Sequence, residues 1–452
     1  MSVSGCSSYQ GDFVNKSEDE LAEMEQLNDS AHELLLNGQY DSAKKILQGL
    51  TAEKTVSRPL YQMEMISLML LMGEDKAALE LMQSLHEDLE LMFDKELEEK
   101  ALSVWHGEVN KVYKGDSYER SAFYALMALS YIKQQNYEDA LRCVKNGLLA
   151  DADSNSEQSI NDNALLYYIG FLAASKVKNE DDAAEYMRGF YSAMEVRGFR
   201  KENQNGDPAA NDCFKQLQKC DPNVVLVLWS GQGPTVACTG EYKENRSIIR
   251  SVNYFDSLAI SVGMNNFNYM PHNVGDINWQ ATTRGGRLMD NVLADKAAAK
   301  KAMEATGNLF FIAGSGLIIA ANYAPSPTNI CFLCSGVGCY IVGGVVYLVG
   351  AAITPTADGR YWRNLPCQFY VIPLKLPPGE HQIAITGMRN SDVAGLAMYN
   401  LTVPQNGGMN VVHLPMLNTG INAAEIVRQK FEEERSAALK KAEANRFAKE
   451  LK

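Results

Sequence analysis

The residues whose types best suit chemistry are Asp358, Arg360 and His381. A carboxylate, a guanidinium and an imidazole can share acid-base work when they lie within about 3 Å of one another and have pKa values near the working pH. Trp362 would then wall the pocket. The competing interpretation is structural: Asp358 pairs with Arg360 or Arg363, and Trp362 fills the core. We favour the structural interpretation and expect no catalysis, because burial at an apolar junction demands paired charges.

Cys331, Cys334 and Cys339 form the densest group of cysteines. A Cys-x-x-Cys pair does redox chemistry at a strand-to-helix turn, and a zinc site needs four ligands. These cysteines lie instead within an apolar run, where a thiol serves as a small apolar filler. The histidines show no metal-binding spacing. We therefore predict no metal site and no cofactor.

The net charge of −13 restricts the classes of partner. Nucleic-acid binding needs a basic face that releases counterions from phosphates, so this balance argues against it. Docking on anionic lipid by charge is disfavoured for the same reason. The length of 452 residues predicts two or three domains, and the hydrophobic content of 46% is typical of a globular protein.

A short phrase recurs in the first half of the chain, where no strand pattern occurs. It consists of a turn, an acidic helix start, an alanine, and two apolar residues three and four positions further on. The four copies begin at Gly38, Gly73, Gln135 and Lys178 and carry Ala43, Ala78, Ala140 and Ala183. Acidic residues suit the positive end of the helix dipole, and alanine lets neighbouring helices approach closely. With a first spacing near the period of about 34 residues, residues 21–220 resemble a tetratricopeptide repeat (TPR) solenoid.

Two roles remain open for this helical array. TPR arrays present a groove for a peptide or helix, which predicts a protein partner bound through the repeat groove. Alternatively the array merely packs on the second half of the chain, because isolated repeats must bury their faces against something.

Residues 221–420 are predicted to form a mixed α/β domain, followed by a charged helix over 421–452. The expected strands are 223–229, 257–262 and 276–282, then one hairpin pairing 367–376 with 380–386 and another pairing 396–403 with 409–415. A Gly-rich turn follows the first strand at Gly231 and Gly233. Such a turn can cradle an anion, but no helix start or Lys follows at P-loop spacing, which favours a tight turn.

Residues 305–357 contain no charged residue and no His. They read as a central Gly-rich apolar helical hairpin, divided at Pro325-Ser326-Pro327. One interpretation is membrane insertion, since residues 330–353 exceed the roughly 20 needed to span a bilayer. The favoured interpretation is burial within the second domain, because the first segment is short and no Lys or Arg anchors the hinge.

Residues 1–20 suit a lipid anchor and its tether. Val3-Ser4-Gly5-Cys6 places small residues before a Cys, as in the acylation signal of bacterial lipoproteins, although no apolar segment precedes them. The polar residues behind Cys6 would act as a spacer. The alternative is an accidental Cys near a terminus. We predict lipidation of Cys6, which would attach the protein to a membrane.

Three motifs make a family resemblance specific. Their residues are Gly231, Gly233 and Pro234; Asp358, Arg360, Trp362, Leu365 and Pro366; and Pro378, Gly379 and His381. In this order they resemble an uncharacterised family of bacterial lipoproteins with a TPR-like N-terminal half, over essentially the whole chain from Cys6. The chain departs from that pattern at Gly359, where the family tends to a hydroxyl residue, and in the apolarity of residues 305–357.

The resemblance implies an α+β multidomain architecture and a lipid-anchored location in the bacterial cell envelope, on the periplasmic face of the outer membrane. It supplies no activity. We therefore expect a scaffold that binds a protein partner. The alternatives are an envelope hydrolase or transferase using Asp358, Arg360 and His381, and a membrane-inserting protein using the Gly-rich hairpin.

Overall fold

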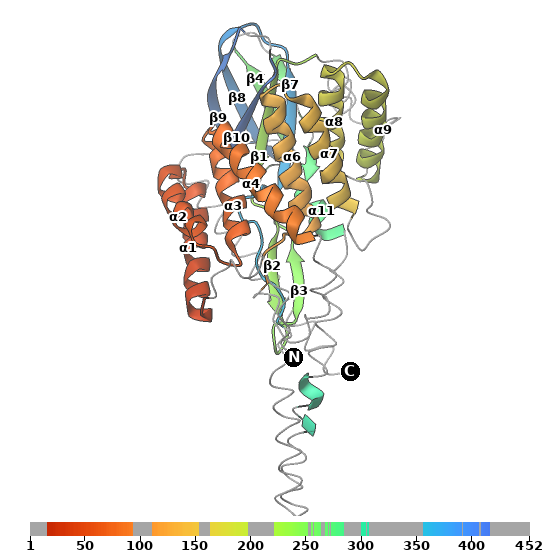
Figure 1. Cartoon of the computed structure of the whole chain (residues 1–452). Coiled ribbons are helices and arrows are strands. Elements are labelled where there is room, and N and C mark those ends of the chain that lie inside the picture. The colour runs from red at the N-terminus through yellow and green to blue at the C-terminus, as the bar shows by residue number, and fades with distance from the viewer. Residues whose placement is uncertain are drawn as a thin grey trace, which may run out of the picture.

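The structure is a computed structural model that describes residues 16–93, 111–152, 163–197, 221–251, 255, 257–263, 267–269, 271, 273–283, 300–303, 305–306, 356–390, 392–405 and 408–415. Cys6 and its tether, residues 307–355 of the apolar hairpin with their cysteines, and the C-terminal helix lie outside the described residues. Within the described part the fold is α+β, with helices in the first half and mixed sheets in the second (Figure 1). In that part, no helix combines the length and the apolar character needed to cross a lipid bilayer.

The described helices of the first half follow one another in pairs whose members contact each other. The pairs are α1 (Glu18–Leu36) with α2 (Tyr40–Ala52), α3 (Arg58–Leu71) with α4 (Asp75–Phe93), α6 (Ser117–Lys133) with α7 (Tyr137–Ala152), and α8 (Ala164–Lys176) with α9 (Glu180–Val196). The second helix of every pair is one copy of the repeated phrase. The predicted helices are therefore present.

The first residue of each phrase has a left-handed backbone. The φ angles are 72° at Gly38, 75° at Gly73, 62° at Gln135 and 59° at Lys178. At the first turn, Gly38 N donates to Leu35 O at 2.9 Å and Gln39 N donates to Leu34 O at 2.8 Å. This pair of bonds is the Schellman motif that ends a helix, and the other three turns contain the same pair. The repeated phrase is thus a helix stop followed directly by a helix start.

The repeated alanines lie where the helices pack. Ala43, Ala78 and Ala140 have no exposed surface, and Ala183 is 9% exposed. A methyl side chain at this position permits close approach of the neighbouring helix.

The described strands form two four-stranded sheets and a two-stranded ribbon. The first sheet has the order β10 (Asn410–Pro415), β1 (Val224–Ser230), β7 (Gln368–Leu374), β6 (Asn273–Asp276). The second sheet has the order β5 (Phe267–Tyr269), β4 (Ser257–Val262), β8 (Gly379–Arg389), β9 (Asp392–Val403). The ribbon joins β2 (Thr235–Thr239) to β3 (Asn245–Ile249). Strand β1 is buried along its whole length, as expected for a central strand with both faces covered.

Both predicted hairpins are wrong in their pairing, although the strands exist. β7 pairs with β1 and β6, whereas β8 pairs with β4 and β9. β10 runs parallel to β1 and does not pair with β9 in the described ladders. The physical reason is burial of the faces. β7 is buried at all but its first residue and suits a sheet covered on both faces, whereas β8 alternates and suits a sheet with one exposed face.

The strand predicted over 276–282 is also wrong. This segment is the short helix α11 (Ile277–Thr283), and Asp276 ends β6. The carboxylate of Asp276 accepts from Trp279 N at 2.8 Å, which satisfies a free N–H of the first helical turn. This local cap favours the helix.

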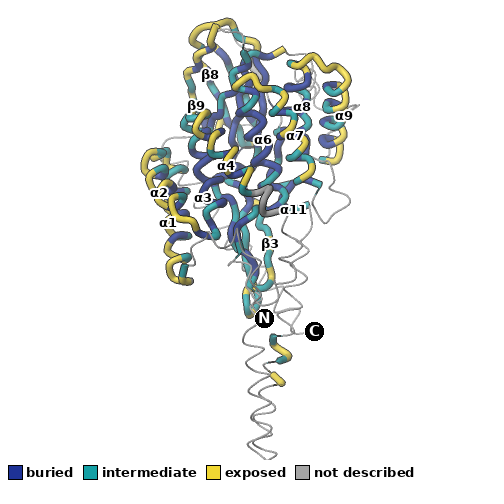
Figure 2. Tube along the Cα trace, viewed as in Figure 1, coloured by how far each residue is buried: buried dark blue, intermediate teal, exposed yellow. Residues whose placement is uncertain are grey.

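Helices and sheet share one cluster of buried apolar side chains. α3 and α6 contact β10, α8 contacts β6, and α11 contacts α6. Figure 2 shows the buried residues continuing from α3 and α6 toward the strands. One side of the helical array is therefore covered by the chain's own sheet.

Replacing Ala78 with Leu is expected to lower the free energy of unfolding by about 1–3 kcal/mol, because three added carbons have no space between packed helices. Urea unfolding of the full chain measures this. The matched control is Ala77→Leu, since the adjacent Ala77 is exposed. Equal effects of the two substitutions would contradict the packing role of the repeated alanine.

Candidate functional site

Residues 356–366, here called the junction segment, connect the ribbon region to β7 and carry the central motif. Its last residues meet the Gly-rich turn after β1. Gly233 N donates to Leu365 O at 2.8 Å, and a Cβ on Gly233 would lie 2.7 Å from that same oxygen. Gly231 has a φ of 66°. The turn is therefore a tight contact with the junction segment, which explains both glycines.

The third motif lies elsewhere. Gly379, with a φ of 134°, begins β8, and His381 follows on the same strand of the second sheet. The Nε2 atom of His381 is 2.8 Å from Pro377 O, a local contact. Asp358 and Arg360 lie instead against the helices, so the structure joins two of the three motifs and leaves His381 outside.

Asp358 and Arg360 form a two-bond ion pair. Arg360 Nε lies 2.9 Å from Asp358 Oδ1, and Arg360 Nη2 lies 2.9 Å from Asp358 Oδ2. The residues are 7% and 5% exposed. The predicted Asp358–Arg360 pair is confirmed, whereas Arg363 pairs with Glu25 and Asp29 of α1, both at 2.7 Å.

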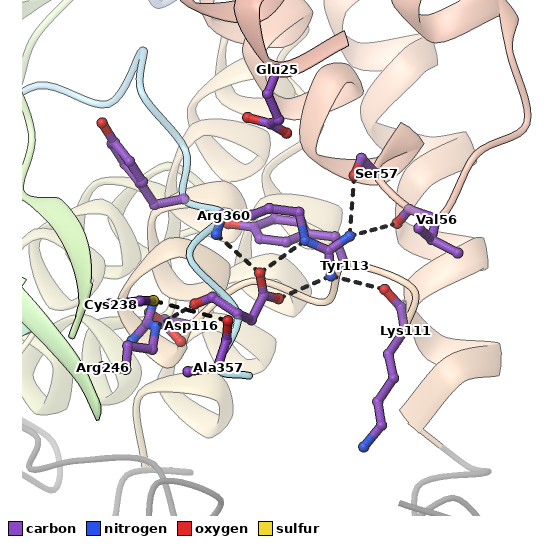
Figure 3. Close-up of polar contacts among 12 residues, drawn as sticks. Glu25, Val56, Ser57, Lys111, Tyr113, Asp116, Cys238, Arg246, Ala357 and Arg360 are labelled. Atoms are coloured by element: carbon purple, nitrogen blue, oxygen red, sulfur yellow. Dashed lines mark hydrogen bonds and ion pairs between the residues drawn. The ribbon is translucent and has the colours of Figure 1, made fainter. Parts of the chain in front are cut away.

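The remaining donors of Arg360 reach the helical half (Figure 3). They donate to Ser57 Oγ at 3.1 Å, Val56 O at 3.3 Å and Lys111 O at 2.8 Å. The guanidinium also lies 5.4 Å from the centre of the Tyr113 ring. This geometry satisfies a buried cation with a carboxylate, neutral acceptors and an aromatic face together.

A second ion pair continues the same network into the ribbon. Arg246 of β3 lies 2.6 Å from Asp116, the residue before α6, and both side chains are less than 10% exposed. Arg246 Nε also donates to Asp358 O at 2.9 Å. The ribbon, the junction segment and α6 are thereby connected by charge-assisted bonds.

Trp362 is buried between the halves, as predicted, and is 1% exposed. Its indole N–H donates to Ser67 Oγ of α3 at 3.0 Å, and its backbone N–H donates to the carboxylate of Glu119 at 2.7 Å. Both polar groups are therefore satisfied by helices, as burial of an indole requires.

Glu64 of α3 holds the backbone beyond Trp362. Its two carboxylate oxygens accept from Arg363 N at 2.7 Å and from Asn364 N at 2.8 Å. In return, the side-chain amide of Asn364 donates to Glu64 O at 3.3 Å. The helices thus bind the junction segment, which turns at residues 363 and 364, through its backbone N–H groups and its Trp and Arg side chains.

Burial raises the pKa of the Glu64 carboxyl to about 8, against the opposing effects of Arg363 and the two N–H donors. Burial also raises the pKa of Glu119, with Asp116 adding repulsion. Displaced carboxyl pKa values are typical of catalytic sites, but structural networks produce them as well. Here the carboxylates are engaged by the chain's own backbone, which favours the structural role.

A small cleft of about 90 Å³ opens beside the junction segment, well below the roughly 300–1,000 Å³ of typical ligand pockets. Its walls include His32, Tyr40, Trp229, Gln232 and Pro366. The Nδ1 atom of His32 lies 2.7 Å from Asn364 Oδ1, and burial lowers the pKa of this imidazole. Among the described residues, no group of three His, Cys, Asp or Glu side chains is placed to hold a metal ion.

Sequence reasoning missed the helical side of this network, above all Glu64 and Glu119. Each is fully buried within a helix that is otherwise largely apolar on every side. A lone Glu in such a helix is a usable signal, because an unpaired buried carboxylate is costly and needs donors. The donors to Glu64 could not be named, since they are backbone groups of a distant segment, whereas Glu119 also closes a capping box with Asp116, three residues earlier.

Replacing Asp358 with Asn is expected to lower the free energy of unfolding by about 3–5 kcal/mol, because Arg360 stays buried without its counter-charge. Adding Arg360→Met should recover part of this loss. Denaturant unfolding of the full chain measures both, with the exposed Asp392→Asn as control. A stable Asp358→Asn protein that loses a turnover would contradict the structural role.

The free energy of unfolding should fall as the pH rises from about 5 to 9. The folded pKa of Glu64, about 8, lies above its ordinary value of 4.5, so the folded protein binds this proton more tightly than the unfolded chain does. The stabilisation from proton binding is complete below pH 4.5 and is lost as the pH rises through 8. The slope from one group is at most about 1.4 kcal/mol per pH unit. Glu64→Gln should flatten the profile, and the exposed Glu138→Gln should leave it unchanged. An unaltered slope in Glu64→Gln would refute the assignment.

No family of known sequences, no curated protein and no solved structure matches the chain significantly. The function must therefore be argued from the contacts themselves.

Proposed function

We propose that this protein is a non-catalytic scaffold of the bacterial cell envelope, anchored by lipid at Cys6, with a TPR-like helical array. The observation that carries the proposal is the use of the central motif. Asp358 and Arg360 bond to each other, and Arg360 also donates to Ser57 at the start of α3. Trp362 donates to Glu119 of α6 and to Ser67 of α3. Residues committed in this way hold two halves of a protein together, which supports a structural role for the motif.

The TPR-like character is supported by the repeated helix pairs, their shared Schellman turns and the buried alanine in each. α3 and α6 already contact β10, and α3 and α6 also bind the junction segment. We therefore place the protein partner on other parts of the array, where helices such as α2, α4, α7 and α9 contribute exposed residues.

The lipid anchor is supported by Ser4-Gly5-Cys6 ahead of a polar tether and by the resemblance of the three motifs to bacterial lipoproteins. Two or more acyl chains hold a protein firmly on a membrane, whereas one chain gives reversible binding. The negative net charge makes a covalent anchor the simpler route to anionic lipid.

A second candidate function, membrane insertion of residues 307–355, is favoured by where this uncharged run starts and ends. Before it, Lys301 lies 3.0 Å from Glu241, and Lys300 lies 5.0 Å from the centre of the Tyr242 ring. At its end, Ala357 N donates to Lys243 O at 3.1 Å. Both ends therefore adjoin the same turn of the ribbon, with two Lys beside one of them, as suits a hairpin that leaves and re-enters at one point.

One fractionation experiment tests both candidates. The chain is produced in a bacterium behind an export signal, as wild type and as Cys6→Ser, and membranes are washed with alkaline carbonate. We expect wild type in the membrane fraction, an acylated Cys6 by intact-mass spectrometry, and Cys6→Ser released.

The other outcomes are equally decisive. A Cys6→Ser protein that resists carbonate and dissolves only in detergent would replace the anchor proposal with the insertion proposal. Release of both forms, with an unmodified Cys6, would overturn both.

A further inference from the structure

The edge strands of the two sheets are protected unequally. Unpaired N–H and C=O groups at a sheet edge invite another strand, so monomeric proteins shorten, cover or charge their edges. Edge strand β6 is covered, because Arg197 donates to Asn273 O at 3.2 Å and to Val274 O at 3.3 Å. Edge strand β10 is contacted by α3 and α6, and edge strand β5 has only three residues.

Within the described part of the chain, strand β9 is neither short nor covered, and its bulge at Ala394 lies near its start. It is 12 residues long and is the last strand of its sheet. After Asp392 it contains no charged residue and no proline. Its outer face carries apolar side chains with high exposure, namely Val393 at 70%, Leu396 at 53% and Met398 at 56%.

The neighbouring strand extends this uncharged surface. Met398 lies opposite Ala384, and Leu396 lies opposite Thr386 on β8. These partners are small and neutral, and the charged residue on that face of β8, Glu380, lies further along the strand, opposite Thr402. Recognition at β9 must therefore use backbone pairing and apolar contact.

We propose that β9 is the interface of a two-fold symmetric dimer of this chain, formed by antiparallel pairing of β9 with β9 of a second copy. The inference is independent of the proposed envelope function. Two chains that each carry −13 repel one another, so a contact between copies belongs where charge is absent, and β9 supplies such a place.

Self-pairing also satisfies the alternation of the strand. In an antiparallel ladder, directly opposed residues point to the same face. A two-fold axis at Met398 sets this residue against its own copy and sets Leu396 against Asn400, all on the outer face. The β5-β4-β8-β9 sheet of one copy then joins the same sheet of the second copy into one continuous sheet. Both copies use the same patch, as a closed dimer requires.

The test is the mass of the full-length chain in non-ionic detergent, measured by sedimentation at several concentrations, with amide hydrogen exchange at the lowest and highest. We expect a dimer, with exchange in β9 slowing as concentration rises. Met398→Lys places two like charges opposite each other and should weaken the dimer at least about tenfold. Leu149→Lys is the matched control, because Leu149 of α7 is 70% exposed and lies outside the sheet.

Three results would overturn the proposal. They are a monomer at the highest concentration, a dimer unaffected by Met398→Lys, and equal weakening by Leu149→Lys. Unchanged circular dichroism of Met398→Lys shows that the variant is folded, which its exposed position favours. If the variant unfolds, concentration-dependent exchange of β9 in the wild type decides the question by itself.

Discussion

Charges removed from water between the helices and the sheet must be matched by partners, because an unpaired buried charge costs several kcal/mol. Arg360 meets this demand with Asp358, three neutral acceptors and the face of Tyr113. The buried carboxyl groups of Glu64 and Glu119 accept backbone N–H groups of the junction segment, and Glu119 also accepts from Asp116 N and Tyr113 Oη. The position of the junction segment, and through it the start of β7, depends on these matches. Trp362 and the Gly233 contact then fill and close the remaining space.

The local features of the fold could be predicted from the sequence. The repeated phrase indicates helix pairs because a Schellman turn, an acidic first turn and a packing alanine are each encoded within ten residues. The apolar run at 223–229 indicates a buried strand for a similarly local reason. The Asp358–Arg360 pair could also be predicted, since the two residues lie two positions apart on one segment.

The features that depend on distant segments could not be predicted. β7 and β8 are adjacent in sequence and resemble a hairpin, yet β7 joins β1, which lies far earlier in the chain. The segment at 276–282 resembles a strand by its residue types, but the cap by Asp276 makes it a helix. Likewise, Glu64 signals a need for donors without showing that they belong to residues 363 and 364.

The junction network also has a consequence for the order in which the chain acquires structure. Trp362 N and Glu119 are 243 positions apart, and Arg363 and Glu25 are 338 apart. During synthesis from the N-terminus, α3 emerges long before the residues that donate to Glu64, so this carboxyl group remains hydrated. Its enclosure must wait until the last third of the chain is available, because burying it earlier would leave it without the backbone donors of Arg363 and Asn364. Completion of the interior is therefore a late, long-range event in this protein, and a chain shortened before residue 366 would lack the groups that allow it to close.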